Sequence, residues 1–563
     1  MDARKLWTVA ILVFLAVGVV TLGVRPMVVP DEPRYGVIPA EMVARGDWLT
    51  LRMNGLAYWE KPPLGYWLTA ASISVLGETP FAIRLPSALA SCVTALCAAW
   101  LAARISGRRE DGPLAFLVQA TTLGPLVLGT VALLDPPFAA CIALTMAAFF
   151  GACTSSGRAR AGWLALAGAA AGLGFLTKGL LAFALPGVAA VAFLAWERRW
   201  RDLLTMPWIP LAAAALAIAP FAWMVERAQP GFWEYFIVVE HFRRAVRPDA
   251  NQHPEPWWHF IAVFPVGAML WTLAWPNALK GLRGAAEWGT GVRFMVSWVV
   301  GPIALLSLSS GKLPTYILPM FAPVAVLVAL GLRRGRETGA VRLDGAALGA
   351  RWALRAAAVA CFAVAAVGIE AFGAPTLWSS GQGVRFALFG VALLAWAQAD
   401  AWAWRAEEGP RWLARTAVAP LAMLVLVPWV YPEAALKASK HPWPALERHA
   451  ADLAGASFIA AGCDTAHAVC WVARRHDVTI GGAPSEFDNE LGRPEDAGRI
   501  LRWPEVAAKV AAARPSLVAY SSTPSPVAVV CAPAEAEQIL AAPGVPAPAM
   551  HDTDGNVSIL IWH

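Results

Sequence analysis

The sequence predicts a polytopic α-helical membrane protein that ends in a small α/β domain. Three observations favour this fold class. Of the 563 residues, 58% are apolar and only 15% are charged, whereas about a quarter of the residues in an ordinary soluble protein carry a charge. Thirteen apolar segments are long enough to cross a bilayer, which takes roughly 20 residues per helix. Residues 433–563 change to short apolar runs with helical patterns between them.

This composition also excludes several classes of protein. It rules out a disordered chain, and 15% charged residues cannot cover the surface of a soluble body of this size. The net charge of +6 is modest and does not call for a nucleic-acid partner. The chain has 28 Trp against 7 Tyr, and Trp is enriched at membrane–water interfaces. Membrane lipids are therefore the expected surroundings.

The apolar segments define the expected membrane domain, residues 1–432. The thirteen predicted spans are 6–24, 79–106, 113–133, 136–154, 161–177, 179–195, 205–226, 257–277, 291–308, 313–333, 351–373, 383–404 and 412–430. The first span is too long for a signal peptide and lacks a small-residue cleavage site, so we expect a retained anchor.

The loops between these spans alternate in charge. The basic set holds Arg4, Lys5, Arg104, Arg108, Arg109, Arg158, Arg160, Arg198, Arg199, Arg201, Lys280, Arg283, Arg333, Arg334, Arg336, Arg342, Arg405 and Arg411. The positive-inside rule assigns this set, and the N-terminus with it, to the cytoplasm. The long loops 25–78 and 227–256 and the C-terminal domain then lie on the outer face.

The C-terminal domain, residues 433–563, has the texture of an α/β fold. Strands are expected in SFIAAG, AVCWVA, VTIGG, SLVAYSS, VAVVCA and NVSILIWH, with helices over 442–453, 504–514 and 533–542. No catalytic constellation is evident there, and a cover over the outer face or a support for an acceptor is the expected role. A Cys463–Cys470 disulfide is one alternative in an oxidising compartment, although spacing alone does not establish its geometry.

The first outer loop carries the most unusual residues. Asp31 and Glu32 follow the first span, and Ile38–Val43 and Leu64–Leu76 are apolar enough for helices that lie along the interface. Between them stands Tyr58-Trp59-Glu60-Lys61-Pro62-Pro63. The two prolines are expected to fix the start of the next helix and to hold Glu60 and Lys61 at its mouth. The alternative is a solvated Glu–Lys pair in a plain loop.

Several of these motifs together resemble one family. VVPDEPRYG, YWEKPPLGYW, AIRLPSALAS, LGFLTKG and SSGKLPTYILP are similar to segments of the bacterial aminoarabinose transferases (ArnT), which belong to the protein-mannosyltransferase-like group of GT-C glycosyltransferases. The resemblance covers residues 1–430. It implies a GT-C fold of about 13 transmembrane helices with outer juxtamembrane helices, in which loops 25–78 and 227–256 roof the active site.

The resemblance also implies an activity. Family members move a sugar from a polyprenyl-phosphate carrier to an acceptor on the outer face. In the ArnT enzymes, 4-amino-4-deoxy-L-arabinose passes from undecaprenyl phosphate to lipid A phosphates, which gives resistance to polymyxin and cationic antimicrobial peptides. A monomer in the bacterial inner membrane with a periplasmic C-terminal domain and no nucleotide cofactor is implied. The transfer is expected to be direct, with inversion.

Two rival functions stay open. One is a related transferase that acts on protein or another glycan. The other is a lipid transporter, which should bury ionisable residues near mid-membrane. In this sequence the unusual charges gather at the outer ends of helices instead, which favours an enzyme.

Residues for the donor phosphate follow from the charge that the reaction releases. Breaking a sugar–phosphate bond leaves an anionic lipid phosphate, which needs cations or donors already in place. The candidates are Lys61, Arg244, Tyr316 and Tyr58. Arg244 lies in VVEHFRRAVRPD, where Glu240 and His241 complete a segment that resembles the family's Glu-His-x-x-Arg. For Arg244 the alternative is a basic patch that faces lipid headgroups.

Asp31, Asp135 and Glu60 are the expected catalytic carboxylates. The resemblance makes Asp31 the family's catalytic acidic position and Asp135, in VALLDPPF, a second one. Because an acceptor phosphate is already anionic, Asp31 is expected to orient a substrate or to steady positive charge at the anomeric carbon. Surplus carboxylates would also suit the ammonium group of an aminosugar. For Asp135 the alternative is the N-cap of the next helix.

Acceptor binding is assigned to isolated cations on the outer face, namely Lys178, Lys312 and Arg34. For Lys178 and Lys312 the alternative is a snorkelling anchor. Arg84 is a weaker candidate that also fits a helix start. Glu60 and His241 could ligate a divalent metal, zinc or magnesium, although the two lie far apart in sequence. Hydrogen bonding without a metal is the alternative.

Overall fold

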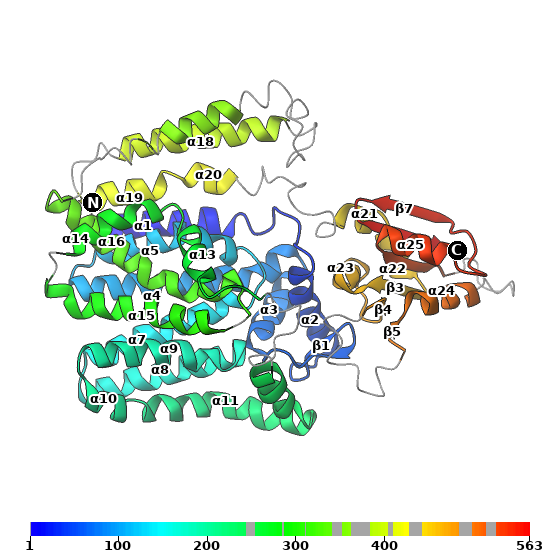
Figure 1. Cartoon of the computed structure of the whole chain (residues 1–563), viewed down its shortest axis with the longest axis horizontal. Helices are drawn as coiled ribbons and strands as arrows, with labels where there is room; N and C mark the ends of the chain where they lie inside the picture. The colour runs from blue at the N-terminus through cyan, green and yellow to red at the C-terminus, as the bar shows by residue number, and fades with distance from the viewer. Residues whose placement is uncertain are drawn as a thin grey trace.

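The computed structural model describes most of the chain and shows a helical bundle with a smaller α/β unit at one end (Figure 1). The described residues are 2–243, 254–283, 286–309, 311–340, 349, 352–361, 383–403, 409–426, 442–483, 498–513 and 525–563. The predicted strand SLVAYSS lies outside them, as does Arg244.

The bundle and its outer helices occupy the chain up to residue 426. Their elements are α1 (Ala3–Phe14), η1 (Leu15–Val19), α2 (Asp31–Arg45), β1 (Arg52–Met53), β2 (Leu56–Ala57), α3 (Leu64–Leu76), α4 (Pro80–Ser106), α5 (Asp111–Thr121), α6 (Leu123–Gly129), α7 (Asp135–Cys153), α8 (Gly157–Lys178), α9 (Leu181–Trp196), α10 (Trp200–Thr205), α11 (Trp208–Ala228), η2 (Glu234–Arg243), α13 (His259–Gly267), η3 (Thr272–Ala274), α14 (Trp275–Leu282), η4 (Ala286–Trp288), α15 (Gly289–Leu308), η5 (Pro314–Met320), α16 (Phe321–Glu337), α18 (Gly383–Ala403), α19 (Gly409–Val418) and α20 (Leu421–Leu426).

Six helical segments in the described residues are long and apolar enough to cross a membrane, and two bent pairs raise this number to at most eight. The six overlap the predicted spans 79–106, 136–154, 161–177, 205–226, 291–308 and 313–333. The count of thirteen stays a prediction, because residues 362–382 and 427–441 lie outside the described chain. A polytopic helical membrane domain is confirmed.

Two predicted spans are wrong as straight helices. The segment 113–133 is broken between α5 and α6 by 69°, and 257–277 is broken by 95°. Thr121 and Thr122 return their hydroxyls to the carbonyls of Leu117 and Val118, at 2.7 and 2.6 Å. Such back-bonding bends helices. The two breaks also meet, because the Trp271 indole donates to the Thr121 hydroxyl at 3.1 Å.

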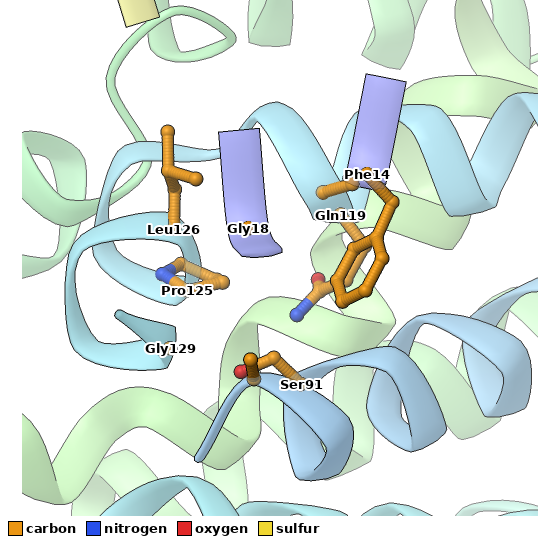
Figure 2. Close-up of a pocket in the computed structure, with 9 residues that line it drawn as sticks. Phe14, Gly18, Ser91, Gln119, Pro125, Leu126 and Gly129 are labelled. Atoms are coloured by element: carbon orange, nitrogen blue, oxygen red, sulfur yellow. The ribbon is translucent and has the colours of Figure 1, made fainter. Parts of the chain in front are cut away.

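Beside the first break lies a small hollow between η1, α4, α5 and α6. Figure 2 shows the amide of Gln119 at this hollow, with Ser91 across from it. Gln119 is only 2% exposed, and its side-chain oxygen has no hydrogen-bond partner among the described residues. A buried polar group without a partner lowers the stability of the fold, and the apolar pattern of the helix does not reveal this free-energy cost.

Small residues let the long helices approach closely. A Cβ at Gly168 on α8 would collide with the backbone of Pro210 on α11, and one at Gly281 on α14 would collide with that of Gly331 on α16. Small residues at such crossings are typical of helix packing in membranes.

The juxtamembrane helices form as predicted in part. The predicted helix 64–76 coincides with α3, and Pro63 is its N-cap residue. The predicted segment 38–43 is too short, because it lies inside the longer helix α2. Between α2 and α3, β1 and β2 form an antiparallel hairpin whose tip holds Asn54 at φ 55°.

The C-terminal unit is an α/β fold, as predicted. Its elements are α21 (Trp443–Arg448), α22 (Ala450–Gly455), β3 (Phe458–Gly462), α23 (Cys463–Ala473), β4 (Thr479–Gly481), β5 (Ile500–Leu501), α24 (Trp503–Ala512), β6 (Val527–Cys531), α25 (Pro533–Leu540), β7 (Met550–Asp554) and β8 (Val557–Trp562). The sheet order is β5-β4-β3-β6-β8-β7. The first four strands are parallel, and β8 and β7 are antiparallel to their neighbours.

Two expectations for this domain are wrong. AVCWVA is the second half of helix α23 rather than a strand, because the parallel pair β3 and β4 requires a crossover between them. Cys463 and Cys470 are not joined by a disulfide. They lie seven residues apart on one helix, about 10 Å along its axis, whereas a disulfide needs Cα atoms within about 7 Å.

The α/β unit docks on α2 and its hairpin. The Asn54 amide donates to the carbonyl of Val478 at 2.6 Å and accepts from the amide of Val478 at 3.0 Å. The Trp443 indole donates to the Met27 carbonyl at 2.6 Å, and the Trp471 ring lies against Gly36. One hydrophobic core runs across this contact, so the unit supports the segment that leads into Tyr58–Lys61.

Candidate active site

The three predicted carboxylates gather around a tyrosine at the end of the bundle near α2. Removal from water raises the pKa of Tyr35, the adjacent Arg34 acts in the opposite direction, and the charges of Asp31, Asp135 and Glu60 raise it further. Asp31 and Tyr35 come from the first turns of α2, Glu60 from the loop before α3, and Asp135 from the start of α7. The fold thus brings together carboxylates that are about a hundred residues apart.

Asp31 keeps an accessible carboxylate. Arg34 donates to it at 2.6 Å across one helical turn, and the Asp31 side chain is 51% exposed. The Arg34 guanidinium also lies 5.3 Å from the centroid of the Tyr35 ring. Asp31 therefore remains accessible from outside the protein.

Glu32, the neighbour of Asp31, is fully buried. It receives hydrogen bonds from Arg84 at 2.7 and 3.0 Å and from Arg25 at 2.7 and 3.0 Å. It also accepts the backbone amides of Val28 at 2.9 Å and Ala132 at 3.0 Å. Burial acts to raise the pKa of Glu32, but the two guanidinium groups outweigh it and hold this pKa at about 2. The carboxylate ties α2 and α4 to the loop that precedes Asp135.

Arg84 accordingly has a structural place. Besides Glu32 it donates to the carbonyls of Leu22 at 2.6 Å, Arg25 at 3.0 Å and Pro26 at 3.1 Å. All of its polar atoms point into protein, and its side chain has no exposed surface. Arg84 is the weaker candidate for substrate binding named above, and these structural hydrogen bonds explain why an arginine is buried at this position.

Lys61 joins loops 25–78 and 227–256. Its ammonium group donates to the carboxylate of Glu240 on η2 and to the carbonyl of Glu60 at 3.1 Å. Next to it the Trp59 indole donates to the Gln229 side chain at 2.8 Å and packs edge-on against Tyr235. Residues from loops 25–78 and 227–256 therefore do meet over the bundle.

Asp135 and Lys178 form a second pair, where α7 begins and α8 ends. The Lys178 ammonium donates to Asp135 at 2.8 Å and lies 5.1 Å from the centroid of the Tyr316 ring. Both side chains are nearly buried, at 9% and 13% exposed. The N-cap alternative for Asp135 is wrong, because Leu134 is the cap residue and Asp135 is the first residue of the helix. Lys178 points at protein groups rather than snorkelling toward headgroups.

Three tyrosines pack against one another beside Glu60. The buried Tyr58 hydroxyl donates to Glu60 at 3.4 Å, and the Tyr58 ring packs edge-on against Tyr66. Tyr66 in turn contacts Tyr35. Burial raises the pKa of both Tyr58 and Tyr66, so both phenols stay protonated donors at neutral pH.

The sequence reasoning missed Tyr35, Tyr66 and the partnership of Glu240 with Lys61. For the tyrosines, scarcity was a usable signal, because the chain holds only 7 Tyr. Five of them lie in or beside this site: Tyr35, Tyr58, Tyr66, Tyr235 and Tyr316. No comparable signal marks Glu240 as the partner of Lys61, 179 residues away.

The remaining candidates lie elsewhere or outside the described chain. Lys312 is 3% exposed and donates to the carbonyls of Glu255, at 2.7 Å, and Ser309, so it joins two loops. The side chain of His241 is not among the described groups. Within the described residues no three His, Cys, Asp or Glu side chains could hold a metal ion together.

Comparison with known proteins assigns the chain to a family. Residues 5–236 match the family model for dolichyl-phosphate-mannose-protein mannosyltransferases. The chain is 32% identical to the undecaprenyl phosphate-α-4-amino-4-deoxy-L-arabinose arabinosyl transferase of Erwinia tasmaniensis, over 86% of each chain. It is 34% identical to that of Pseudomonas paraeruginosa, over 89% of each chain.

Solved structures give the same fold. The crystal structure of ArnT from Cupriavidus metallidurans bound to undecaprenyl phosphate superimposes with a TM-score of 0.78 at 22% identity, over 99% of this chain and 97% of that one. Its apo form gives a TM-score of 0.79 at 21% identity, over 100% and 98%. Given these matches along nearly its whole length, the chain belongs to the undecaprenyl phosphate-α-4-amino-4-deoxy-L-arabinose arabinosyl transferases, membrane-spanning glycosyltransferases of the GT-C fold.

Proposed function

We propose that the protein transfers 4-amino-4-deoxy-L-arabinose from undecaprenyl phosphate to phosphate groups of lipid A. The reaction takes place on the periplasmic face of the bacterial inner membrane, with the N-terminus of a monomeric chain in the cytoplasm. One observation carries the proposal: in a chain of this family, three carboxylates, paired cations and tyrosines gather at one end of the bundle, around Tyr35.

The carrier phosphate is assigned to Lys61, with Arg244 as a second cation and with Tyr58 and Tyr316 as hydroxyl donors. The ammonium of Lys61 is held at the start of α3 by its bond to Glu240. As the sugar–phosphate bond breaks, negative charge grows on the carrier phosphate, and a cation already in place stabilises it without reorganisation. Glu240 keeps that cation positioned until the phosphate takes over its charge.

The aminosugar is assigned to the carboxylates. Its ammonium group needs negative partners, and Glu60 and Asp31 lie close enough to Tyr35 to act on its hydroxyl. Asp135 and Asp31 already share their charge with Lys178 and Arg34, so Glu60 is the first candidate for the ammonium group, and Asp31 can join it once Arg34 binds a phosphate. The tyrosine hydroxyls supply neutral donors and acceptors for the sugar oxygens.

The transfer itself needs no covalent enzyme intermediate. An oxygen of the lipid A phosphate attacks the anomeric carbon, the bond from that carbon to the carrier phosphate oxygen breaks with its electron pair, and the configuration inverts. Asp31 orients the attacking phosphate and steadies positive charge at the anomeric carbon, because that phosphate has no proton to lose. Lys178 and Arg34 are assigned to the acceptor phosphate, and Lys312 holds the loop beside Tyr316.

The decisive experiment uses a polymyxin-sensitive bacterial strain that lacks its own transferase. Expression of this chain should add aminoarabinose to lipid A, visible by mass spectrometry, and should raise polymyxin resistance because the lipid loses negative charge. Asp31→Ala, expressed to the same level, is the matched control and should leave lipid A unmodified. Unmodified lipid A with the wild-type chain present and donor available would overturn the proposal and favour an acceptor such as protein or another glycan.

A divalent ion, zinc or magnesium, is a further part of the proposal. Glu60 and His241 would hold it near the carrier phosphate, where it would neutralise developing charge. Chelation of the purified enzyme tests this point. Activity that falls with a chelator and returns with added metal supports a metal, and unchanged activity assigns the charge to Lys61 and Arg244 alone.

A further inference from the structure

A hollow lies at the end of the bundle opposite to the candidate active site. It has a volume of about 440 Å³ and is formed by α1, α18 and α19. The N-terminus lies beside α19 in Figure 1, whereas α2 and the docked α/β unit mark the other end. Its residues take no part in the proposed reaction.

Three cations from two elements face this hollow. Lys5 comes from α1, and Arg411 and Arg415 come from α19. The two arginines are four residues apart, so they share one face of their helix, where like charges destabilise it. The opposite face of α19 is fixed in the core by Trp412 and Leu413. The helix therefore cannot rotate to carry the two arginines away from Lys5, and no acidic side chain from the described residues lines the hollow.

The remaining lining is aromatic and apolar. The guanidinium of Arg415 lies 4.2 Å from the centroid of the Trp402 ring, which is 47% exposed. Val9 of α1 and Val418 of α19 continue the lining. Trp beside basic residues is the usual composition of a membrane interface, and apolar side chains next to it suit an acyl chain.

We propose that this hollow binds the phosphate headgroup of an anionic phospholipid. The phosphate would lie between Arg411 and Arg415, with Lys5 closing the site from α1, and the acyl chains would run along Val9 and Val418. Basic pockets between membrane helices bind such headgroups elsewhere. The lipid would neutralise the repulsion within α19 and would tie α1 to α18 and α19.

The test is native mass spectrometry of the full-length protein in detergent. Phosphatidylglycerol should bind at the site and phosphatidylcholine should not. Each removed cation should weaken binding about fivefold, so that Lys5→Gln/Arg411→Gln/Arg415→Gln weakens it about 100-fold. The matched control is Arg4→Gln/Arg201→Gln, which removes exposed cations of the same charge outside the hollow and should bind like the wild type.

Three outcomes would overturn the inference. The first is equal retention of phosphatidylglycerol and phosphatidylcholine. The second is unchanged phosphatidylglycerol binding in both the single variant Lys5→Gln and the triple variant. The third is equal occupancy by inorganic phosphate alone, which would indicate a free-anion site. Elution of each variant as the wild-type species in size-exclusion chromatography checks the fold. Activity on lipid A is a separate readout, so failure here leaves the proposed function untouched.

Discussion

Replacement of Glu32 by Gln should destabilise the protein far more than any exposed ion-pair change. The substitution keeps the shape of the side chain but leaves the guanidinium groups of Arg25 and Arg84 without their shared negative charge. The pKa of Glu32 is held at about 2, against an ordinary value of 4.5. At about 1.4 kcal/mol per pKa unit, this difference is worth about 3 kcal/mol at neutral pH, and the loss of one partner of a buried pair typically costs about 3–5 kcal/mol.

The sign of this effect also fixes a pH window. Because the pKa of Glu32 is lowered in the folded state, its stabilisation is complete above pH 4.5 and is lost only as the pH falls toward 2. Glu32→Gln should therefore behave at pH 7 as the wild type behaves only in strong acid. Thermal unfolding of the detergent-solubilised protein measures the change.

A matched control is Asp477→Asn, which breaks the exposed pair with Arg475 and should cost under about 1 kcal/mol. Glu32→Gln/Arg84→Gln should recover part of the loss, because one stranded charge is gone. A Glu32→Gln protein whose unfolding matches that of Asp477→Asn would refute this account of the buried network.

Three other changes probe the site and the bundle. Asp135→Asn and Lys178→Gln should each lower lipid A modification about 100- to 1,000-fold, as for a lost charge-stabilising group. The double variant should be no worse than either single variant, because Asp135 and Lys178 act as a pair. Additive losses of activity would instead show independent roles. Lys61→Ala should lower lipid A modification by a similar factor, while the unfolding temperature of the protein barely changes, because the Lys61–Glu240 ion pair is partly exposed. An equal loss of activity in Lys61→Arg would indicate that the site requires the shape of lysine and not only its charge. Gln119→Leu should stabilise the protein by about 1 kcal/mol, because it removes a buried oxygen without a partner, and a lower unfolding temperature would mean that the amide has one.

Local rules predicted the parts of the fold that depend on neighbouring residues. Pro62 and Pro63 fixed the start of α3, and apolar length identified the six long spans. Strand composition located β3, β4, β6 and β8. AVCWVA was misjudged because β-rich composition cannot reveal that a parallel neighbour requires a helix in between. The helix breaks at Thr122 and near Trp271 were not predicted either, because the two breaks contact each other from distant parts of the sequence.

The acidic pair shows why the site could be predicted only in part. In the sequence Asp31 and Glu32 form one motif, and the resemblance treats them together. On a helix, neighbouring residues point about 100° apart, so Asp31 is half exposed while Glu32 has no exposed surface. Only the placement of Arg25 and Arg84 decides which carboxylate is structural. A single sequence contains no information about that placement.

The pairing of the cations also changes how substrate binding should be understood. Lys61, Lys178 and Arg34 each have a carboxylate partner, namely Glu240, Asp135 and Asp31. A lone cation at the edge of a bilayer would carry a desolvation cost that a partner offsets. Under the proposed function, the lipid phosphates would enter by exchange. Each phosphate would take over a cation from a carboxylate, and the carboxylate so released would become available to the ammonium of the aminosugar. A carrier with a neutral sugar would leave that carboxylate without a cationic partner. The same ion pairs that stabilise the empty site would therefore also favour an aminosugar over other sugars.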